Sequence, residues 1–370
     1  MRLALRRIGH LVRKELRQLF RDPRMARVIF VAPAVQLVVF GYAVNTDVRG
    51  TPVLLLDRDR TAASRALVQS LTASGYFRIV GEVGRPGELV RALDRGEATL
   101  ALEISRGFAR DLARGREPAV QILVDGTSSN TANVAQGHAA RLVTEFGLRR
   151  PGRAVESPVD FRPRVWYNPT LASRVYNVPA VAGVIIMLMC LMLTALSVVR
   201  EREMGTLEQL MVSPLRPAEL VIGKTIPVAL VALADLVLVT AIAVLWFGIP
   251  LKGSPLLLVG ASLPYILAGL GTGLLISGVS NTQQEAYMTM FLVFLPAMLL
   301  SGFMFPVSSM PAVFQWITLV NPIRHFLEVV RGVFLKGVGL EVLWPQVLAL
   351  TGMAAALLWA ATRRFGATRH

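Results

Sequence analysis

The sequence predicts an α-helical polytopic membrane protein with six transmembrane helices and an inserted α/β domain. Of its 370 residues, 54% are hydrophobic and only 17% are charged, whereas a typical soluble domain is about 25% charged. Several uncharged stretches reach the roughly 20 apolar residues that a membrane-spanning helix needs. A long segment after the first of these stretches instead alternates strand-like and helix-like runs, which is typical of an α/β domain.

The six spans are predicted from stretches with almost no charge. They are residues 28–44, 178–199, 226–249, 254–280, 286–305 and 342–362. The uncharged run that contains the fifth span continues to residue 323, and Pro306 and Pro311 interrupt it. We therefore expect a single span there, followed by re-entrant or outer helices over 306–340, because irregular backbone at membrane depth must be covered by protein or water.

Basic residues predict the orientation. The segment 1–27 is rich in Arg and Lys, and the tail 363–370 contains Arg363, Arg364 and Arg369. By the positive-inside rule both termini are cytoplasmic, which requires an even number of spans. The segment 45–177 then lies outside the cytoplasm. We expect the first span to be retained rather than cleaved as a signal peptide, because the charged region before it is too long.

Within 1–27, apolar residues recur at helical spacing over residues 3–20, with basic residues on the other side. This pattern predicts an amphipathic helix at the cytoplasmic membrane surface. Such a helix is either a topology anchor or a contact for a cytoplasmic partner.

The segment 45–177 is expected to form the α/β domain and a linker back to the membrane. Strands are expected at 53–56, 78–83, 99–104 and 120–124, and helices near 62–74, 87–95, 107–114 and 131–147. The Pro- and Arg-rich strip 151–169 is expected to be the linker.

No catalytic or metal-binding constellation is evident. One Cys and four scattered His argue against a metal centre. Gly223, Lys224 and Thr225 resemble the end of a P-loop, but Ala218 stands where that motif needs its first glycine, so we expect this chain to bind no cofactor itself. Its basic residues lie mostly at membrane borders, which argues against nucleic acid as a partner.

Two features lie inside predicted spans. Asp235 stands near the middle of 226–249, where an ionised carboxylate is unfavourable. It is either a contact in the translocation path or a carboxyl that is hydrogen-bonded inside the bundle. Gly269 and Gly273 stand about one turn apart, and we expect them to let a neighbouring helix approach closely.

The cytoplasmic connection 200–225 carries balanced charges. Thr206 is expected to cap a short helix over 207–212 that stops near Pro214, and Gly205 allows the turn before it. A short helix across the membrane surface can transmit force from a soluble partner, although an ordinary connecting loop is the alternative.

Five stretches, taken in order, carry a family resemblance. They are KELRQLFRDPR (14–24), DGTSSNTAN (125–133), WYNP with RVYNVPAVAG (166–183), REREMGTLEQLMVSPLRPAELVIGK (200–224) and LPAMLLSGFMFPVSSMPAVFQWITLVNPIRHFLEVVRGVFLKG (295–337). The chain resembles, over essentially its whole length, the permease subunits of ABC-2 type ATP-binding-cassette exporters. The resemblance is to the multidrug-efflux-like branch with a large extracytoplasmic domain.

The resemblance implies partners and roles for particular residues. Separate cytoplasmic ABC ATPase subunits would bind ATP and Mg²⁺, and a second copy or a homologous permease would complete a dimer. The implied coupling helix to the ATPase consists of Gly205, Thr206, Leu207, Glu208, Gln209 and Leu210. Glu15 and Arg17 would face the same partner from the N-terminal helix. The implied outer re-entrant motif consists of Asn321, Pro322 and Arg324 at a turn and Arg331 at the outer interface.

The implied function is ATP-driven export of a drug-like or lipophilic substrate across a bacterial cytoplasmic (inner) membrane. Membrane lipid and a periplasmic adaptor are further expected partners. An ion-driven secondary transporter is one alternative, but it would favour several intramembrane charges and inverted repeats. The other is a membrane-anchored sensor of an extracytoplasmic ligand, which would need a larger cytoplasmic output segment than 363–370.

Overall fold

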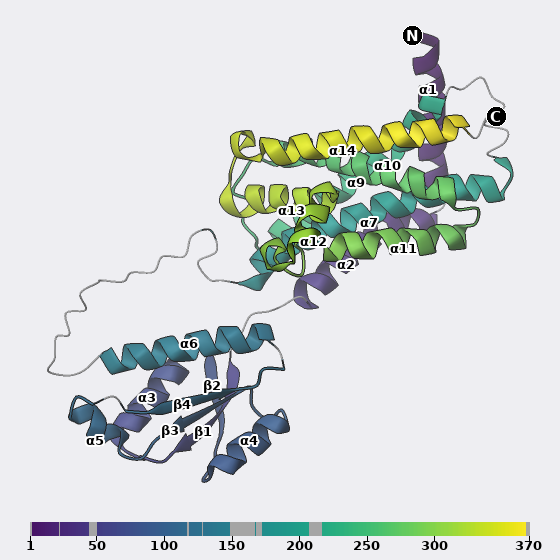
Figure 1. Cartoon of the computed structure of the whole chain (residues 1–370). Coiled ribbons are helices and arrows are strands. Elements are labelled where there is room, and N and C mark those ends of the chain that lie inside the picture. Colours follow the sequence, from purple (N-terminus) through teal and green to yellow (C-terminus); the bar gives the residue numbers. More distant parts are fainter. Residues whose placement is uncertain are drawn as a thin grey trace. The chain divides into compact units, whose positions relative to one another are not determined.

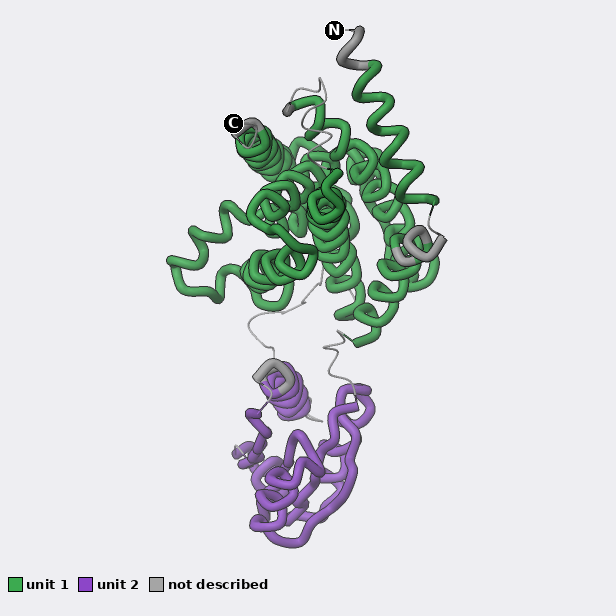
Figure 2. Tube along the Cα trace, turned by 90° about the vertical axis from the view of Figure 1, so that its right-hand side faces the viewer, with its two compact units in different colours: residues 1–45, 165–370 green, residues 46–164 purple. Residues whose placement is uncertain are grey.

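The computed structural model describes residues 2–21, 23–43, 50–116, 118–127, 129–148, 167, 172–206 and 217–367. The chain divides into two compact units, one formed by 1–45 with 165–370 and the other by 46–164. Figure 2 colours the first unit green and the second purple. Each unit has its own hydrophobic core.

The first unit is a bundle of helices (Figure 1). Its α-helices are α1 (Arg2–Arg21), α2 (Pro23–Ala43), α7 (Ser173–Glu203), α9 (Pro217–Leu245), α10 (Pro255–Val279), α11 (Gln283–Leu299), α12 (Ala312–Ile317), α13 (Pro322–Arg331) and α14 (Leu340–Ala367). Shorter turns are η1 (Val307–Ser309), η2 (Thr318–Val320) and the π-helical η3 (Gly332–Lys336). The expected N-terminal helix is confirmed as α1.

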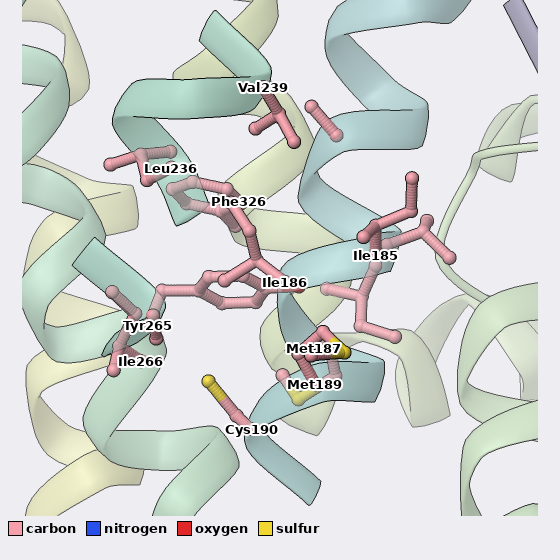
Figure 3. Packing of buried hydrophobic residues seen from close by; sticks show 14 of the residues in the cluster. Ile185, Ile186, Met187, Met189, Cys190, Leu236, Val239, Tyr265, Ile266 and Phe326 are labelled. Atoms are coloured by element: carbon pink, nitrogen blue, oxygen red, sulfur yellow. The ribbon is translucent and has the colours of Figure 1, made fainter. Parts of the chain in front are cut away.

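The bundle core is built around α7. In Figure 3, Tyr265 of α10 lies against Phe326 of α13, beside Ile186 of α7. The rings of Tyr265 and Phe326 stack with their centroids 3.9 Å apart. The buried Tyr265 hydroxyl donates to the Gly183 carbonyl oxygen at 2.8 Å, which satisfies its polar end. The aromatic pair thereby joins three helices.

Among the described residues, four helices are long and apolar enough to cross a membrane, and they overlap four of the predicted spans. They are Ser173–Glu203, Ala218–Leu245, Pro255–Val279 and Leu340–Phe365. The first predicted span falls in α2, whose apolar described part is only Ile29–Ala43. The count of six spans therefore stays a prediction.

The helix within the fifth predicted span, 286–305, ends earlier than the span was expected to end. Its helix α11 has 17 residues and ends at Leu299. Beyond it, Gly302 adopts a left-handed conformation with φ of 81°, which a continuing α-helix cannot accommodate. The apolar composition of the following residues hid this turn.

The long helices alternate in direction, so their ends gather in two groups. At one end, Gln283 donates its N–H to Glu203 at 2.7 Å and Arg364 donates to the Gly278 carbonyl oxygen at 3.2 Å. We call this the α1 end. It comprises residues 2–21, 200–206, 217–224, 278–285 and 363–367. At the other, the α13 end, Gly253 donates its N–H to the Val333 carbonyl oxygen at 2.9 Å.

Glycines let α10 pack closely against two neighbouring helices, whereas the sequence predicted a close approach by one. A Cβ at Gly273 would lie 2.9 Å from the Thr194 Cβ on α7. A Cβ at Gly269 would lie 2.9 Å from the Cys190 Cβ on the same helix. Gly271 faces α14 in the same way. Glycines on two different sides of α10 therefore serve two helix contacts.

The second unit is a four-stranded mixed sheet with helices on both faces. Its elements are β1 (Thr51–Asp57), α3 (Ala62–Ala73), β2 (Phe77–Glu82), α4 (Pro86–Asp94), β3 (Leu100–Ile104), α5 (Phe108–Ala113), β4 (Val120–Val124) and α6 (Ser129–Leu148). The strand order is β2-β1-β3-β4, with β1 parallel to β2 and β3, and β4 antiparallel to β3. All four expected strands and all four expected helices are present.

Alternation along β1 explains why both faces of this sheet are covered. Val53 and Leu55 enter a core that also contains residues of α3, α5 and α6, whereas Leu54 and Leu56 enter a core with α4. A central parallel strand that is buried on both faces reads as a continuous apolar run. The placement of this unit outside the cytoplasm stays a prediction, and most of the expected linker lies outside the described residues.

Candidate functional site

Four charged side chains from three helices meet at the α1 end. Lys224 of α9 lies 2.7 Å from Glu201 of α7 and 3.3 Å from Glu15 of α1. Lys14 of α1 lies 2.9 Å from Glu201. Lys224 and Glu201 are each only 3% exposed. We call Lys14, Glu15, Glu201 and Lys224 the buried ion cluster; its two ammonium groups and two carboxylates balance one another.

Local sequence explains how α1 reaches these partners. Leu11 and Glu15 are one turn apart on α1, and both are buried. The Leu11 side chain packs where a Cβ on Gly223 would stand, so the missing side chain lets α1 approach α9. Gly223 and Lys224, the residues that resemble part of a P-loop, therefore form a helix-packing and ion-pairing element.

Lys14 keeps its charge in this setting. Burial alone would lower the pKa of Lys14, but the hydrogen bond and the negative charge of Glu201 outweigh this and raise the pKa above its ordinary value. The ammonium is consequently charged at neutral pH.

One sequence-based expectation about α1 is wrong. Glu15 is 7% exposed and pairs within the chain, so it does not face outward toward a partner. The reason is that the buried Lys224 needs carboxylates on its α1 side. Arg17 is exposed and remains available to an outside partner.

The described start of the predicted coupling segment lies next to the cluster. Gly205 has a φ of 69° and donates its N–H to the Arg202 carbonyl oxygen at 3.0 Å, which ends α7 as expected for that glycine. The Thr206 hydroxyl donates to the Glu201 carbonyl oxygen at 3.2 Å. Leu207, Glu208, Gln209 and Leu210 lie outside the described residues, and α9 resumes at Pro217, about two turns before Lys224.

Sequence reasoning missed Lys14, Glu201 and Lys224 as site residues. All three lie within stretches that carry the family resemblance. The available signal was the presence of acidic and basic residues beside several predicted spans. However, Lys14 and Glu201 are separated by 187 residues in the sequence, and Glu15 and Lys224 by 209 residues. A pattern in the local sequence cannot reveal pairs that are so far apart along the chain.

Asp235 lies within α9 and is 1% exposed. Neither carboxyl oxygen has a hydrogen-bond partner in the part of the chain that the structure describes. The alternative in which this carboxyl is hydrogen-bonded inside the bundle is therefore wrong for the described residues. An unpartnered buried carboxyl is unfavourable for folding, so Asp235 stands apart from the paired charges of the α1 end.

We expect Asp235→Leu to stabilise the fold by about 1–3 kcal/mol, because it removes a buried polar group without a partner. The midpoint of thermal unfolding in detergent measures this, with Asp94→Leu on the exposed surface of α4 as the control. A lower midpoint for Asp235→Leu would show that the carboxyl has a stabilising partner. Loss of transport in a stabilised variant would support a role in the translocation path.

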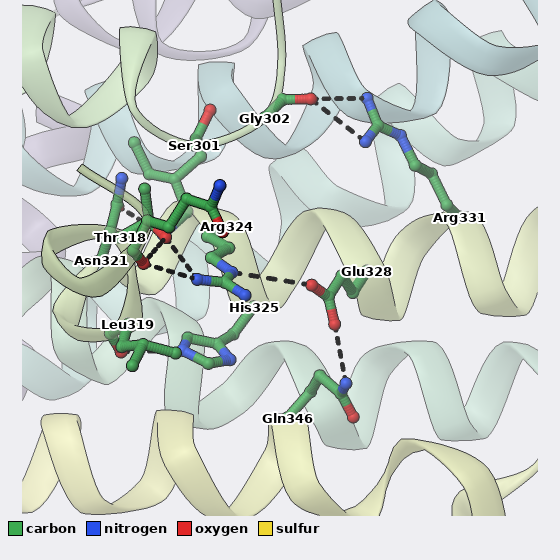
Figure 4. Close-up of polar contacts among 12 residues, drawn as sticks. Ser301, Gly302, Thr318, Leu319, Asn321, Arg324, His325, Glu328, Arg331 and Gln346 are labelled. Atoms are coloured by element: carbon green, nitrogen blue, oxygen red, sulfur yellow. Dashed lines mark hydrogen bonds and ion pairs between the residues drawn. The ribbon is translucent and has the colours of Figure 1, made fainter. Parts of the chain in front are cut away.

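At the α13 end, three predicted residues organise the start of α13 (Figure 4). The Asn321 carboxamide oxygen accepts from the Ile323 N–H at 3.0 Å, and its NH₂ donates to the Ala297 carbonyl oxygen at 2.6 Å. Pro322 is the first residue of α13. Arg324 donates to the Thr318 hydroxyl and lies 3.8 Å from Glu328.

Arg331 connects α13 to other elements of the bundle. Both of its terminal nitrogens donate to the Gly302 carbonyl oxygen at 3.3 Å. Its guanidinium lies 3.9 Å from the centroid of the Tyr176 ring on α7. Its expected place at an outer interface of the assembly stays a prediction.

These observations define a multi-pass integral membrane protein with buried charge pairs at one end of its helix bundle. The chain belongs to the ABC-2 transporter family: the family model "ABC-2 family transporter protein" matches residues 28–363. It is therefore a membrane permease, not an enzyme, and its family implies an ATPase partner.

Curated relatives agree over nearly the whole chain. The chain is similar to the "Probable multidrug ABC transporter permease YbhR" of Escherichia coli K12, with 33% identity over 94% of this chain and 97% of that protein. It is 32% identical to YbhS of the same strain, which has the same description, over 98% of both chains. It is also 31% identical to the "Inner membrane transport permease YhhJ", again over 98% of both. These matches do not favour a secondary transporter or a sensor.

Proposed function

We propose that this chain is the permease subunit of an ATP-driven ABC-2 exporter in a bacterial cytoplasmic membrane. It moves a drug-like or lipophilic substrate out of the cytoplasm or the inner leaflet. The multidrug wording in the names of YbhR and YbhS supports this substrate class. Separate ATPase subunits bind ATP and Mg²⁺, a second copy or a homologous permease completes the dimer, and lipid covers the exposed apolar faces.

The proposed topology has six crossings, formed by α2, α7, α9, α10, α11 and α14, with both termini in the cytoplasm. The α1 end is cytoplasmic in this arrangement, which agrees with its many basic residues. The unit 46–164 is extracytoplasmic and is the part that a periplasmic adaptor would meet. The segment 306–340 forms the outer re-entrant helices, with Arg331 at the outer interface.

The observation that carries the proposal is the buried ion cluster. It joins α1, the last turn of α7 and the second turn of α9, and the segment 205–216 connects those two spans. A force applied to that segment by an ATPase would therefore act on two spans whose ends are joined to each other and to α1 by paired charges. Because nucleotide favours the closed ATPase pair, its binding shifts the permease toward a second conformation.

The double variant Glu208→Ala with Leu210→Ala tests this coupling. We expect substrate-stimulated ATP hydrolysis by the reconstituted complex to fall, because the contact from Gly205 to Leu210 with the ATPase is weakened, while membrane insertion is unchanged. Glu97→Ala on the exposed surface of the second unit is the control. Undiminished stimulation in the double variant would reject the assignment of this segment as the coupling helix.

A further inference from the structure

The second unit has a cleft at the carboxyl ends of β1 and β2. Its volume is about 770 Å³, and β1, α3 and the residues after β2 line it. Ligands of open α/β sheets bind outside the carboxyl ends of the parallel strands. The position of the cleft is therefore one at which such folds accommodate small molecules.

Two arginines and one exposed carboxylate line this cleft. Arg60 and Arg65 are exposed, and neither guanidinium forms an ion pair with a carboxylate among the described residues. Arg58 nearby is different, because it lies 3.0 Å from Glu103. Glu82 contributes a carboxylate on the β2 side. Guanidinium groups present a planar fork of donors that matches carboxylate and phosphate groups.

The nearby aspartates already have donors. Asp57 accepts from the N–H groups of Asp59 and Arg60 at 3.0 and 2.9 Å and from the Ser64 hydroxyl at 2.6 Å. Asp59 accepts from the N–H groups of Gly107 and Ala109 at 2.8 and 3.0 Å. Burial opposes ionisation of Asp59, but these bonds and one from the Thr61 hydroxyl outweigh it and lower its pKa. Asp57 and Asp59 thus hold the turn and leave Arg60 and Arg65 without a carboxylate.

The turn itself places Arg60 beside the cleft. Arg60 has a φ of 51°, a left-handed conformation that is rare for a residue with a side chain. The bond from its N–H to Asp57 holds this conformation, and Arg65 donates to the Arg60 carbonyl oxygen at 3.2 Å. A strained residue that is fixed by its neighbours at a cleft is typical of a functional position.

Apolar groups complete the lining. Leu55, Val68 and Val83 lie beside the two arginines in the same cleft. We infer that the cleft binds a small amphipathic anion, whose carboxylate or phosphate pairs with Arg60 and Arg65 while its apolar body contacts Val68 and Val83. This inference concerns the second unit alone and does not rest on the proposed transport activity.

Calorimetric titration of the full chain in lipid nanodiscs tests the inference, with phenyl phosphate as the probe. We expect saturable binding that benzyl alcohol, which lacks the anionic group, does not reproduce. Arg60→Gln and Arg65→Gln should each weaken binding about tenfold or more, since each removes charge-assisted hydrogen bonds. Arg106→Gln, an exposed arginine of the same unit outside the cleft, should leave binding unchanged.

Glu82→Gln distinguishes a direct electrostatic effect from damage to the fold. Removing this carboxylate should tighten binding of phenyl phosphate, which a misfolded cleft would not do. Absence of saturable binding in the natural chain would overturn the inference. So would unchanged affinity in both Arg60→Gln and Arg65→Gln, or equal binding of benzyl alcohol.

Discussion

Replacing Lys224 with methionine is expected to destabilise the helical unit by about 3–5 kcal/mol, the typical effect of removing one partner of a buried ion pair. Glu201 would stay buried at 3% exposure, and Glu15 would lose the ammonium 3.3 Å away. Lys14 remains close to Glu201 but is itself 47% exposed, so it compensates only in part. The midpoint of thermal unfolding of the purified chain in detergent measures the loss.

Two further variants separate the cluster from general effects of charge removal. Combining Lys224→Met with Glu201→Met leaves Lys14 and Glu15, which lie 3.6 Å apart and balance each other, so most of the lost stability should return. Arg95→Met breaks an exposed pair with Glu97 and should change stability by less than about 1 kcal/mol. If Lys224→Met behaved like Arg95→Met, the buried ion cluster would not be a structural link between α1, α7 and α9.

The second large effect is expected at the glycine face of α10. A Cβ at Gly273 would stand 3.2 Å from the Leu191 backbone oxygen as well as 2.9 Å from the Thr194 Cβ, and backbone cannot rotate away. Overpacking of this kind typically destabilises by about 1–3 kcal/mol, so Gly273→Ala should lower the unfolding midpoint. Gly273→Leu should disrupt the contact between α7 and α10 and expose the chain to protease.

Gly260 on the same helix is the matched control. Apart from the adjoining backbone of α10 itself, no described atom lies within 4 Å of a Cβ placed there. Gly260→Ala should therefore stabilise slightly, by up to about 1 kcal/mol, through helix propensity alone. Equal midpoints for Gly273→Ala and Gly260→Ala would contradict the close-packing role of the glycine face.

Local sequence patterns were enough to predict the strands and helices of the second unit. Its strands alternate with helices at short spacing, and the continuous apolar run of β1 fits a strand buried on both faces. The ends of the helices in the first unit were harder to predict. For example, the apolar composition continues past Leu299, where α11 ends, and the left-handed Gly302 marks the turn. Apolar composition indicates that a segment is buried in lipid or protein, but it does not indicate where a helix ends and the chain turns.

The candidate site was predictable in part. The family resemblance indicates a functional role for the segment after α7 and for α1. It also implies that Glu15 faces an outside partner, whereas Glu15 pairs with Lys224 within the chain. A helix that is amphipathic in apolar residues can still turn an acidic residue inward when a buried cation faces it. That partner comes from a different span, so no pattern along α1 could reveal it.

Reconstitution in liposomes tests the proposal that the α1 end couples this permease to a separate ATPase. ATP hydrolysis is measured in liposomes that contain the chain alone, a candidate ABC ATPase from the same organism alone, or both together. We expect stable co-purification of the two proteins and substrate-stimulated hydrolysis only when both are present. The stimulation should be lost in Lys224→Met and recovered in the double variant Lys224→Met with Glu201→Met. A chain that binds no ATPase and moves solute under an ion gradient alone would contradict the proposal.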